Sequence, residues 1–169
     1  PQVVAIRDNQ VLLEDGSSFV WDDGKDKDYD EMLLNPDMKD AFTYPYPFKG
    51  KVANRNEDTS RIRHLGFYKA IYGHSESEVR EHLIWLPWFP EYFEKSFILI
   101  TTANGVDKAF RRVMERLTHL QQAYYQFLSD QDAFYWRNIA DSPNLSPHSL
   151  GIALDINTQF SKYWLWDKK

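Results

Sequence analysis

A histidine and an aspartate seven positions apart are the two side chains of this sequence whose types and spacing best suit chemistry. His148 lies in a stretch rich in turn formers, and Asp155 lies in an alternating run, residues 152–157, that predicts a strand. Gly151, between them, allows the positive φ or the close approach that a turn into a strand often needs. Imidazole and carboxylate are ligands that zinc takes in catalytic sites. By spacing alone, such a pair is more often a structural hydrogen bond than half of a metal site.

Hydrophobic periodicity predicts the elements that must position this pair. Residues 3–21 predict two or three short strands joined by Asp-Gly-type turns, and residues 97–102 predict a buried strand. Residues 59–72 and 106–127 predict helices, the second because apolar side chains recur along it at steps of three and four. A Ser-x-x-Glu box at residues 75–78 predicts the start of a further short helix.

These elements together predict an α+β fold, a small mixed sheet with flanking helices. The aromatic segment 83–90 contains two prolines that exclude a regular helix, and we expect it to form a wall of the core. The length suits one domain, residues 1–169. Within it we expect residues 1–95 to be an N-terminal extension and residues 96–169 to be the core that contains the His–Asp pair.

Composition narrows the classes of partner. The chain has 169 residues, a net charge of -5 and 16% aromatic residues, so disorder over most of it is not expected. No run of Lys and Arg is long enough to follow a phosphate backbone, so we expect no nucleic-acid partner. No apolar run has the length of a membrane span. The absence of Cys excludes disulfides, thiolate nucleophiles and Cys-ligated zinc.

An aspartate-rich block at residues 22–30 is the other feature that could bind a metal. It lacks the ordered acidic spacing and the terminal Glu of an EF-hand loop. Runs of charge are usually solvated, so we predict a solvated loop here and keep calcium binding as the alternative.

The stretch around the His–Asp pair resembles the Ser-x-His-x-x-Gly-x-Ala-x-Asp signature of the D-alanyl-D-alanine carboxypeptidase and dipeptidase family. This family of zinc peptidases includes vancomycin-resistance D,D-peptidases and phage peptidoglycan endopeptidases. The resemblance covers about residues 97–166 and implies the fold shared by Hedgehog proteins and D,D-peptidases. All five fixed positions of the signature are present, at Ser146, His148, Gly151, Ala153 and Asp155.

The resemblance implies a zinc metallopeptidase that hydrolyses peptidoglycan stem peptides containing D-amino acids, in the periplasm, the cell envelope or the secreted fraction of a bacterium. It implies zinc as the cofactor, with His148 and Asp155 as two ligands. Ser146 would help to shape the metal loop, and Gly151 would let it pass close to the metal. Arg137, in an aromatic segment upstream, would hold a substrate carboxylate or stabilise the oxyanion through its fork of donors.

The sequence departs from the family after the signature. The family completes its site with a Glu, the general base, shortly before a His, the third ligand. No His follows Asp155 here, so the general base is unknown. We expect a further C-terminal segment of the same polypeptide to complete the site. The alternatives are an inactive or incomplete cell-wall-binding domain on the same scaffold, or an interaction module in which His148 and Asp155 only hydrogen-bond to each other.

Overall fold

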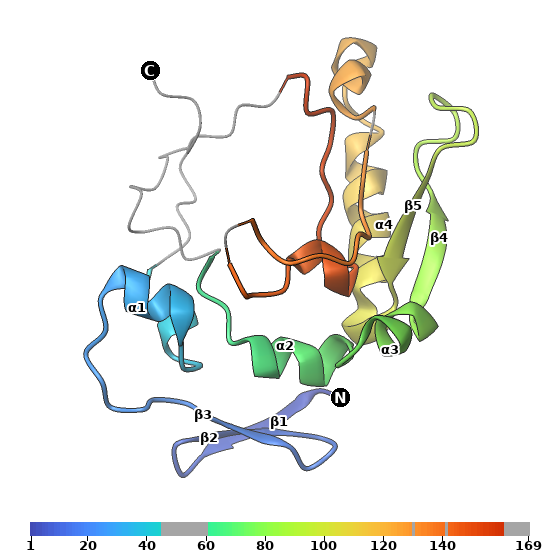
Figure 1. The fold of residues 1–169 in the computed structure, drawn as a ribbon. Helices are drawn as coiled ribbons and strands as arrows, with labels where there is room; N and C mark the ends of the chain where they lie inside the picture. The colour runs from blue at the N-terminus through green and yellow to red at the C-terminus, as the bar shows by residue number, and fades with distance from the viewer. Residues whose placement is uncertain (45–60, 130, 141, 161–169) are drawn as a thin grey trace. The chain divides into compact units, whose positions relative to one another are not determined.

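The computed structural model describes residues 1–44, 61–129, 131–140 and 142–160, and it divides into two compact units (Figure 1). The first unit is Pro1–Ile71 and the second is Tyr72–Lys169. Both units combine short antiparallel strands with helices. The predicted α+β class is therefore confirmed, with two separate antiparallel sheets in the described residues in place of one mixed sheet.

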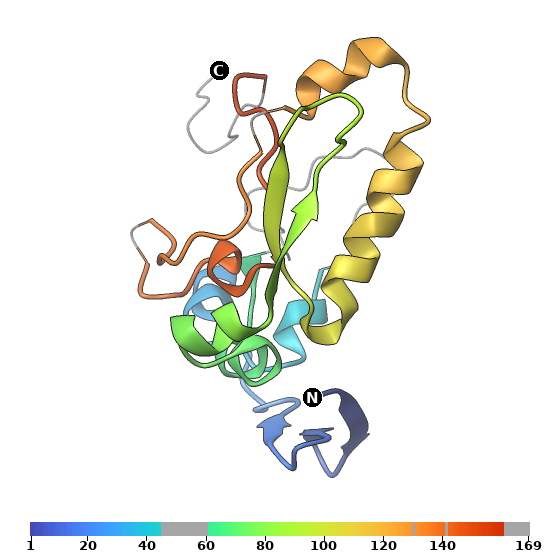
Figure 2. The same cartoon turned by 90° about the vertical axis from the view of Figure 1, so that its right-hand side faces the viewer.

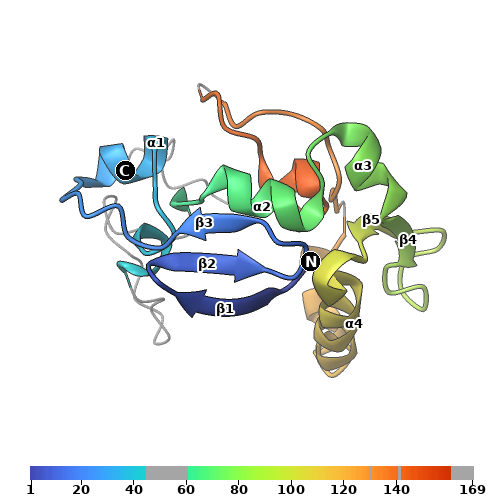
Figure 3. The same ribbon diagram turned by 90° about the horizontal axis from the view of Figure 1, so that it is seen from below.

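The first unit contains a three-stranded sheet in the order β1-β2-β3, seen from below in Figure 3. Its strands are β1 (Val3–Arg7), β2 (Gln10–Leu13) and β3 (Ser18–Val20). Asp8 and Asn9 both have positive φ between β1 and β2, as the tight turns that suit the twist of a hairpin require. The predicted strands of residues 3–21 are thus confirmed.

Short helices follow this sheet. The capping box of Asp28 opens α1 (Tyr29–Leu34), and a single 3-10 turn (Asp40–Phe42) comes next. The helix predicted from residue 59 begins later, as α2 (Leu65–Tyr72), and residues 59 and 60 lie outside the described part of the chain.

His64 lies at the start of α2, and its Nδ1 accepts a hydrogen bond from the Phe67 N–H at 3.1 Å. Burial lowers the pKa of His64, which favours the neutral ring that this acceptor role needs.

The second unit is built on a two-stranded antiparallel sheet. As predicted, Ser75 caps a short helix, α3 (Glu76–Glu81), which leads into β4 (Leu83–Pro87). The partner strand, β5 (Phe97–Thr101), is the buried strand predicted from the sequence, and it ends one residue earlier than expected. Leu86, Trp88 and Phe89 are buried in the core, whereas Trp85 is 67% exposed, so the expected wall of the core is formed by part of the aromatic segment.

Helix α4 (Val106–Leu117) lies alongside the β4–β5 pair (Figure 2) and packs Phe110 and Met114 against the core of this unit. The prediction of one helix over residues 106–127 is wrong, because α4 ends at Leu117 and a separate 3-10 helix (Gln122–Phe127) follows. The side chain of Tyr125 turns back into the core, and its hydroxyl donates to the Leu117 carbonyl at 3.3 Å. The Leu117 carbonyl also accepts from the Leu120 N–H at 3.0 Å, so a turn and the Tyr125 hydroxyl take the place of the next turn of the helix.

The strand predicted for residues 152–157 is also absent as a regular element. Asp155 pairs with Asp132 in an isolated antiparallel bridge, and Gly151 accepts a hydrogen bond from the Thr101 N–H at 3.1 Å. The segment is therefore extended and held at separate points, without a continuous ladder. The side chain of Ile156 is 41% exposed, so the alternation does not bury one full face.

Candidate metal site

His148 lies in a one-turn 3-10 helix, Pro147–Leu150, that is fixed at both ends. At its start the Ser146 Oγ accepts from the His148 N–H at 3.4 Å, and Pro147 supplies the restrained φ that suits a first helical position. At its end Gly151 has a φ of 66° and donates its N–H to the His148 carbonyl at 3.1 Å. The sequence predicted a turn here, and the turn is present.

Gly151 also permits a close approach between this turn and the β4–β5 sheet. A Cβ added at Gly151 would lie 2.7 Å from the Leu83 Cδ2 and 3.0 Å from the Thr101 nitrogen. Both uses of glycine expected from the sequence, a positive φ and close packing, are therefore confirmed. The consequence is that the His148 turn is held directly against the end of the sheet.

The orientation of the His148 ring is set by a backbone carbonyl. The residue is 9% exposed, and its Nδ1 lies 2.5 Å from the Ala133 oxygen. A carbonyl oxygen only accepts, so Nδ1 must be the donor, and in the neutral ring Nε2 then has a free lone pair. Nε2 lies 3.3 Å from the Oδ2 of Asp155. Two acceptors face each other unless the ring is protonated or a cation binds both.

Asp155 is held by backbone hydrogen bonds on both sides. Asp132 donates to the Asp155 carbonyl at 3.0 Å and accepts from the Asp155 N–H at 2.8 Å. Two residues on, the buried Asn157 side chain donates at 2.7 Å to both the Gln126 carbonyl and the Ser129 Oγ. The Asp155 side chain itself is 53% exposed, so this carboxylate faces solvent from a fixed backbone.

Arg137 is tied to the His148 turn through its backbone. The Oγ of Ser149, a residue with no exposed surface, accepts from the Arg137 N–H at 2.8 Å and lies within hydrogen-bonding distance of the Tyr135 and Arg137 carbonyls. The Ser146 N–H donates to the Arg137 carbonyl at 3.0 Å. The Arg137 side chain is exposed, and no ion pair of its guanidinium occurs within the described ranges. Ser146 and Ser149 thus fix the backbone of Arg137 beside the His148 turn.

Sequence reasoning missed Ser149 and Ala133. Ser149 sits at a variable position of the signature, and its only signal was a small hydroxyl residue next to the histidine. Ala133 acts through its main-chain oxygen, for which no sequence signal exists. Neither contact could be predicted before the chain was folded.

Two of the expected ligands are brought together, and a third is not. In the part of the chain that the structure describes, no further His, Asp or Glu joins His148 and Asp155 in a compact group of ligand atoms. Residues 161–169, to which the resemblance extends in part, lie outside the described residues.

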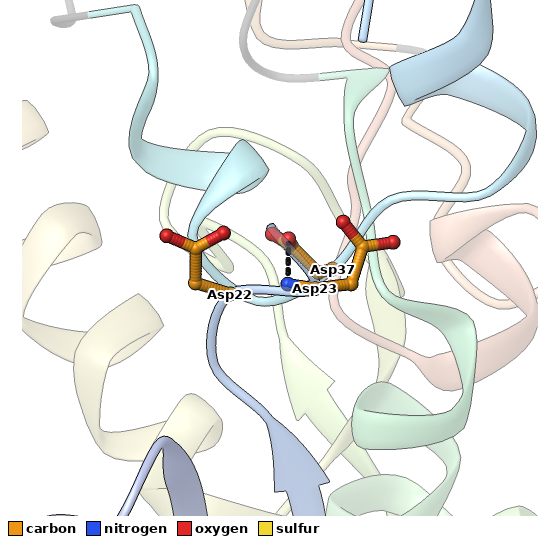
Figure 4. Close-up of side chains that lie close together, drawn as sticks. All are labelled: Asp22, Asp23 and Asp37. Carbon is orange, nitrogen blue, oxygen red and sulfur yellow. Dashed lines mark hydrogen bonds between the residues drawn. The ribbon is translucent and has the colours of Figure 1, made fainter. Parts of the chain in front are cut away.

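The first unit contains an acidic group of its own, Asp22, Asp23 and Asp37, whose oxygens lie within 4.8 Å of one another (Figure 4). The Asp37 Oδ2 accepts from the Asp23 N–H at 2.9 Å, which is the dashed line in Figure 4. The Lys39 Nζ lies 2.5 Å from the Oδ2 of Asp22. Exposed acidic groups are common without a metal, and this one already has a protein cation beside it.

A buried lysine supplies the rest of the positive charge. The Lys27 side chain is 6% exposed, and its Nζ lies 2.7 Å from Asp40, 3.1 Å from Asp23 and 3.6 Å from Asp37. Burial alone would lower the pKa of Lys27, but hydrogen bonds to Asp40 and Asp23 raise it above its usual value, so the ammonium stays charged. Residues 22–28 are therefore a largely exposed loop, as predicted, in which the side chain of Lys27 turns inward and pairs with the neighbouring carboxylates.

Replacing this lysine tests that assignment. Lys27→Met should lower the free energy of unfolding by about 3 kcal/mol, because three carboxylates lose their buried counter-ion. Lys25→Met is the matched control: Lys25 is 67% exposed beside Asp23, and its loss should cost about 0.5 kcal/mol or less. Urea denaturation measures both. Equal effects of the two changes would contradict a structural role for Lys27.

The Gly151 geometry gives a second prediction. Gly151→Ala should destabilise the protein by about 2 kcal/mol or more, through positive φ and through the clash with Leu83 and Thr101. Gly105→Ala is the control because Gly105 has a similar φ of 70° but open space where the alanine Cβ would lie. Both positions have positive φ, so the difference in melting temperature between the two variants measures the cost of the close contact alone. No difference would show that the turn does not need it.

Comparison of the chain with protein-family models, with curated proteins and with solved structures finds no match. None of the helices in the described ranges is both long and apolar enough to cross a membrane.

Proposed function

We propose that the chain is a zinc metallopeptidase that hydrolyses peptidoglycan stem peptides containing D-amino acids. The observation that carries this proposal is the pairing of His148 Nε2 with Asp155 Oδ2, on a ring whose other nitrogen is held by a carbonyl. The pair occurs within a complete Ser-x-His-x-x-Gly-x-Ala-x-Asp signature. The matching location is the periplasm, the cell envelope or the secreted fraction of a bacterium.

The donor set of the pair fits zinc. Two ligands on a tetrahedral zinc, with bonds of about 2.0–2.1 Å, have donor atoms about 3.3 Å apart. The Nε2–Oδ2 distance here is 3.3 Å. Metal-binding histidines commonly donate their second ring N–H to a carbonyl or carboxylate, as His148 does to Ala133. Zinc, when bound, would supply a Lewis acid that activates water and polarises the scissile carbonyl.

Arg137 is the residue we assign to the substrate. Its side chain is exposed, and its backbone is fixed by hydrogen bonds to Ser146 and Ser149. The long side chain can therefore extend into solvent from a backbone position fixed beside the His148 turn. A guanidinium binds a carboxylate with two parallel hydrogen bonds, which suits the free C-terminus of a stem peptide.

The proposal requires a third ligand and a general base from outside the described residues. Within the described ranges no third ligand groups with His148 and Asp155, which favours one second candidate, a cell-wall-binding domain that holds stem peptides without cleaving them. The two functions differ in turnover and share the ligand class, so one set of measurements separates them.

Zinc content and peptide hydrolysis test the proposal directly. The purified protein should hold about one zinc per chain and release D-alanine from a synthetic stem peptide ending in D-alanyl-D-alanine. A chelator should abolish the release, and added zinc should restore it. His148→Ala should lose both zinc and turnover, whereas His119→Ala, an exposed histidine after α4, should keep both.

The outcomes separate three functions. Peptide binding without release of D-alanine, in a chain that holds zinc, would favour the cell-wall-binding domain. A chain that takes up no zinc, or a His148→Ala variant with unchanged zinc, would contradict the metal site and leave a His–Asp hydrogen bond in an interaction module.

Arg137→Ala should lower kcat/KM about tenfold or more for a peptide with a free C-terminal carboxylate, because a charge-assisted hydrogen bond is lost. Arg137→Lys should restore only part of this, since a lysine cannot form the paired contact. The same peptide with an amidated C-terminus is the control, and on it the variants should differ little from the parent. An equal loss on both peptides would contradict the carboxylate contact.

A further inference from the structure

Asp132 lies directly opposite Asp155, although nothing in the signature involves it. The two residues exchange both backbone hydrogen bonds, at 3.0 and 2.8 Å, in an isolated antiparallel bridge. Residues paired in this way project their side chains to the same side of the two chains, with Cβ atoms about 5 Å apart. Asp132 therefore places a second carboxylate on the face where Asp155 meets His148.

This arrangement brings negative charge together without a compensating protein cation. Within the described ranges, Asp155 contacts His148, which is a cation only when its ring is protonated, and neither aspartate pairs with a lysine or an arginine. Like charges directly opposite each other are destabilising. The Nε2 of His148 adds a lone pair to the same face, because Nδ1 is the nitrogen that donates to Ala133, and the residue is only 9% exposed.

The acidic group of the first unit shows the contrast. There, Lys27 and Lys39 lie within ion-pair distance of the carboxylates and offset their repulsion. At the second site Asp155 contacts the imidazole of His148, whose Nδ1 already donates to Ala133, and Asp132 lies opposite Asp155 in the backbone bridge. Such a face suits an external cation.

We propose that Asp132 is an outer carboxylate of the cation site, strengthening the binding of a divalent metal by its charge without being a ligand itself. This inference rests on the zinc site proposed above. Asp132 stands outside ligand distance, because it does not join His148 and Asp155 in a compact group of ligand atoms. A single negative charge near a divalent cation on a solvent-facing surface contributes about fivefold to metal affinity by Coulomb attraction alone.

Zinc affinity, measured by competition with a chromophoric chelator, tests the role. Asp132→Asn keeps the size and the backbone bridge but removes the charge, so zinc should bind about fivefold more weakly. Asp155→Asn, which removes a ligand, should weaken binding further. Glu115→Gln on the exposed side of α4 is the control for net charge and should leave the affinity unchanged.

A second measurement is made on the metal-free protein. Asp132→Asn should raise the midpoint of urea unfolding, since it relieves the repulsion with Asp155, and the gain should vanish in an Asp155→Asn background. If Asp132 serves cation binding, Asp132→Asn should both raise the stability of the metal-free protein and weaken zinc binding. A residue with only a structural role would lose stability.

The outcomes separate this inference from the proposed function. If the parent chain binds zinc and Asp132→Asn matches Glu115→Gln, the outer carboxylate is wrong and the zinc site stands. If Asp132→Asn loses as much affinity as Asp155→Asn, Asp132 is a ligand and the outer role is wrong. If the parent chain binds no zinc at all, the proposed function fails and this inference fails with it.

Discussion

The hydrogen bond from His148 Nδ1 to the Ala133 carbonyl is the interaction on which the candidate site depends. It fixes the ring within a buried turn and leaves Nε2 as an acceptor that faces Asp155. Without it, the ring could present either nitrogen, and the pair could be an ordinary hydrogen bond. The turn on one side and the Asp132–Asp155 bridge on the other then bring the imidazole and the carboxylate to the spacing of two zinc ligands.

The chain contains two acidic arrangements that differ in how their charge is balanced. Around Lys27 the carboxylates surround a buried ammonium, and the result is an ordered segment of the first unit. Around His148 no ammonium or guanidinium of the described residues pairs with the carboxylates, and the face they form is partly open to solvent. A protein that needs only stability gains from the first arrangement. In the second, we propose that Asp132 and Asp155 repel each other and that a bound cation would offset this repulsion.

Much of the fold follows from local patterns. The hairpins of the first unit, the Ser75 cap and strand β5 were all predictable, because alternation, turn residues and capping act within a few positions. The predictions of one helix over residues 106–127 and of a strand over residues 152–157 are wrong for one reason. Helix α4 ends at Leu117 because Tyr125 packs into the core, and residues 152–157 form no ladder because they are held at separate contacts with distant segments. Local sequence patterns do not predict contacts with distant segments that override the local preference for a helix or a strand.

The sequence by itself determined the composition of the site: a histidine, an aspartate and a glycine at a spacing that suits a turn followed by an extended chain. It also predicted that Gly151 would be needed for conformation and close packing. Only the tertiary structure decided that the ring is oriented by a main-chain oxygen, that Ser149 ties Arg137 to the turn, and that Asp132 lies opposite Asp155. Those contacts join segments distant in sequence, largely through backbone groups that every residue has in common, so no residue pattern encodes them.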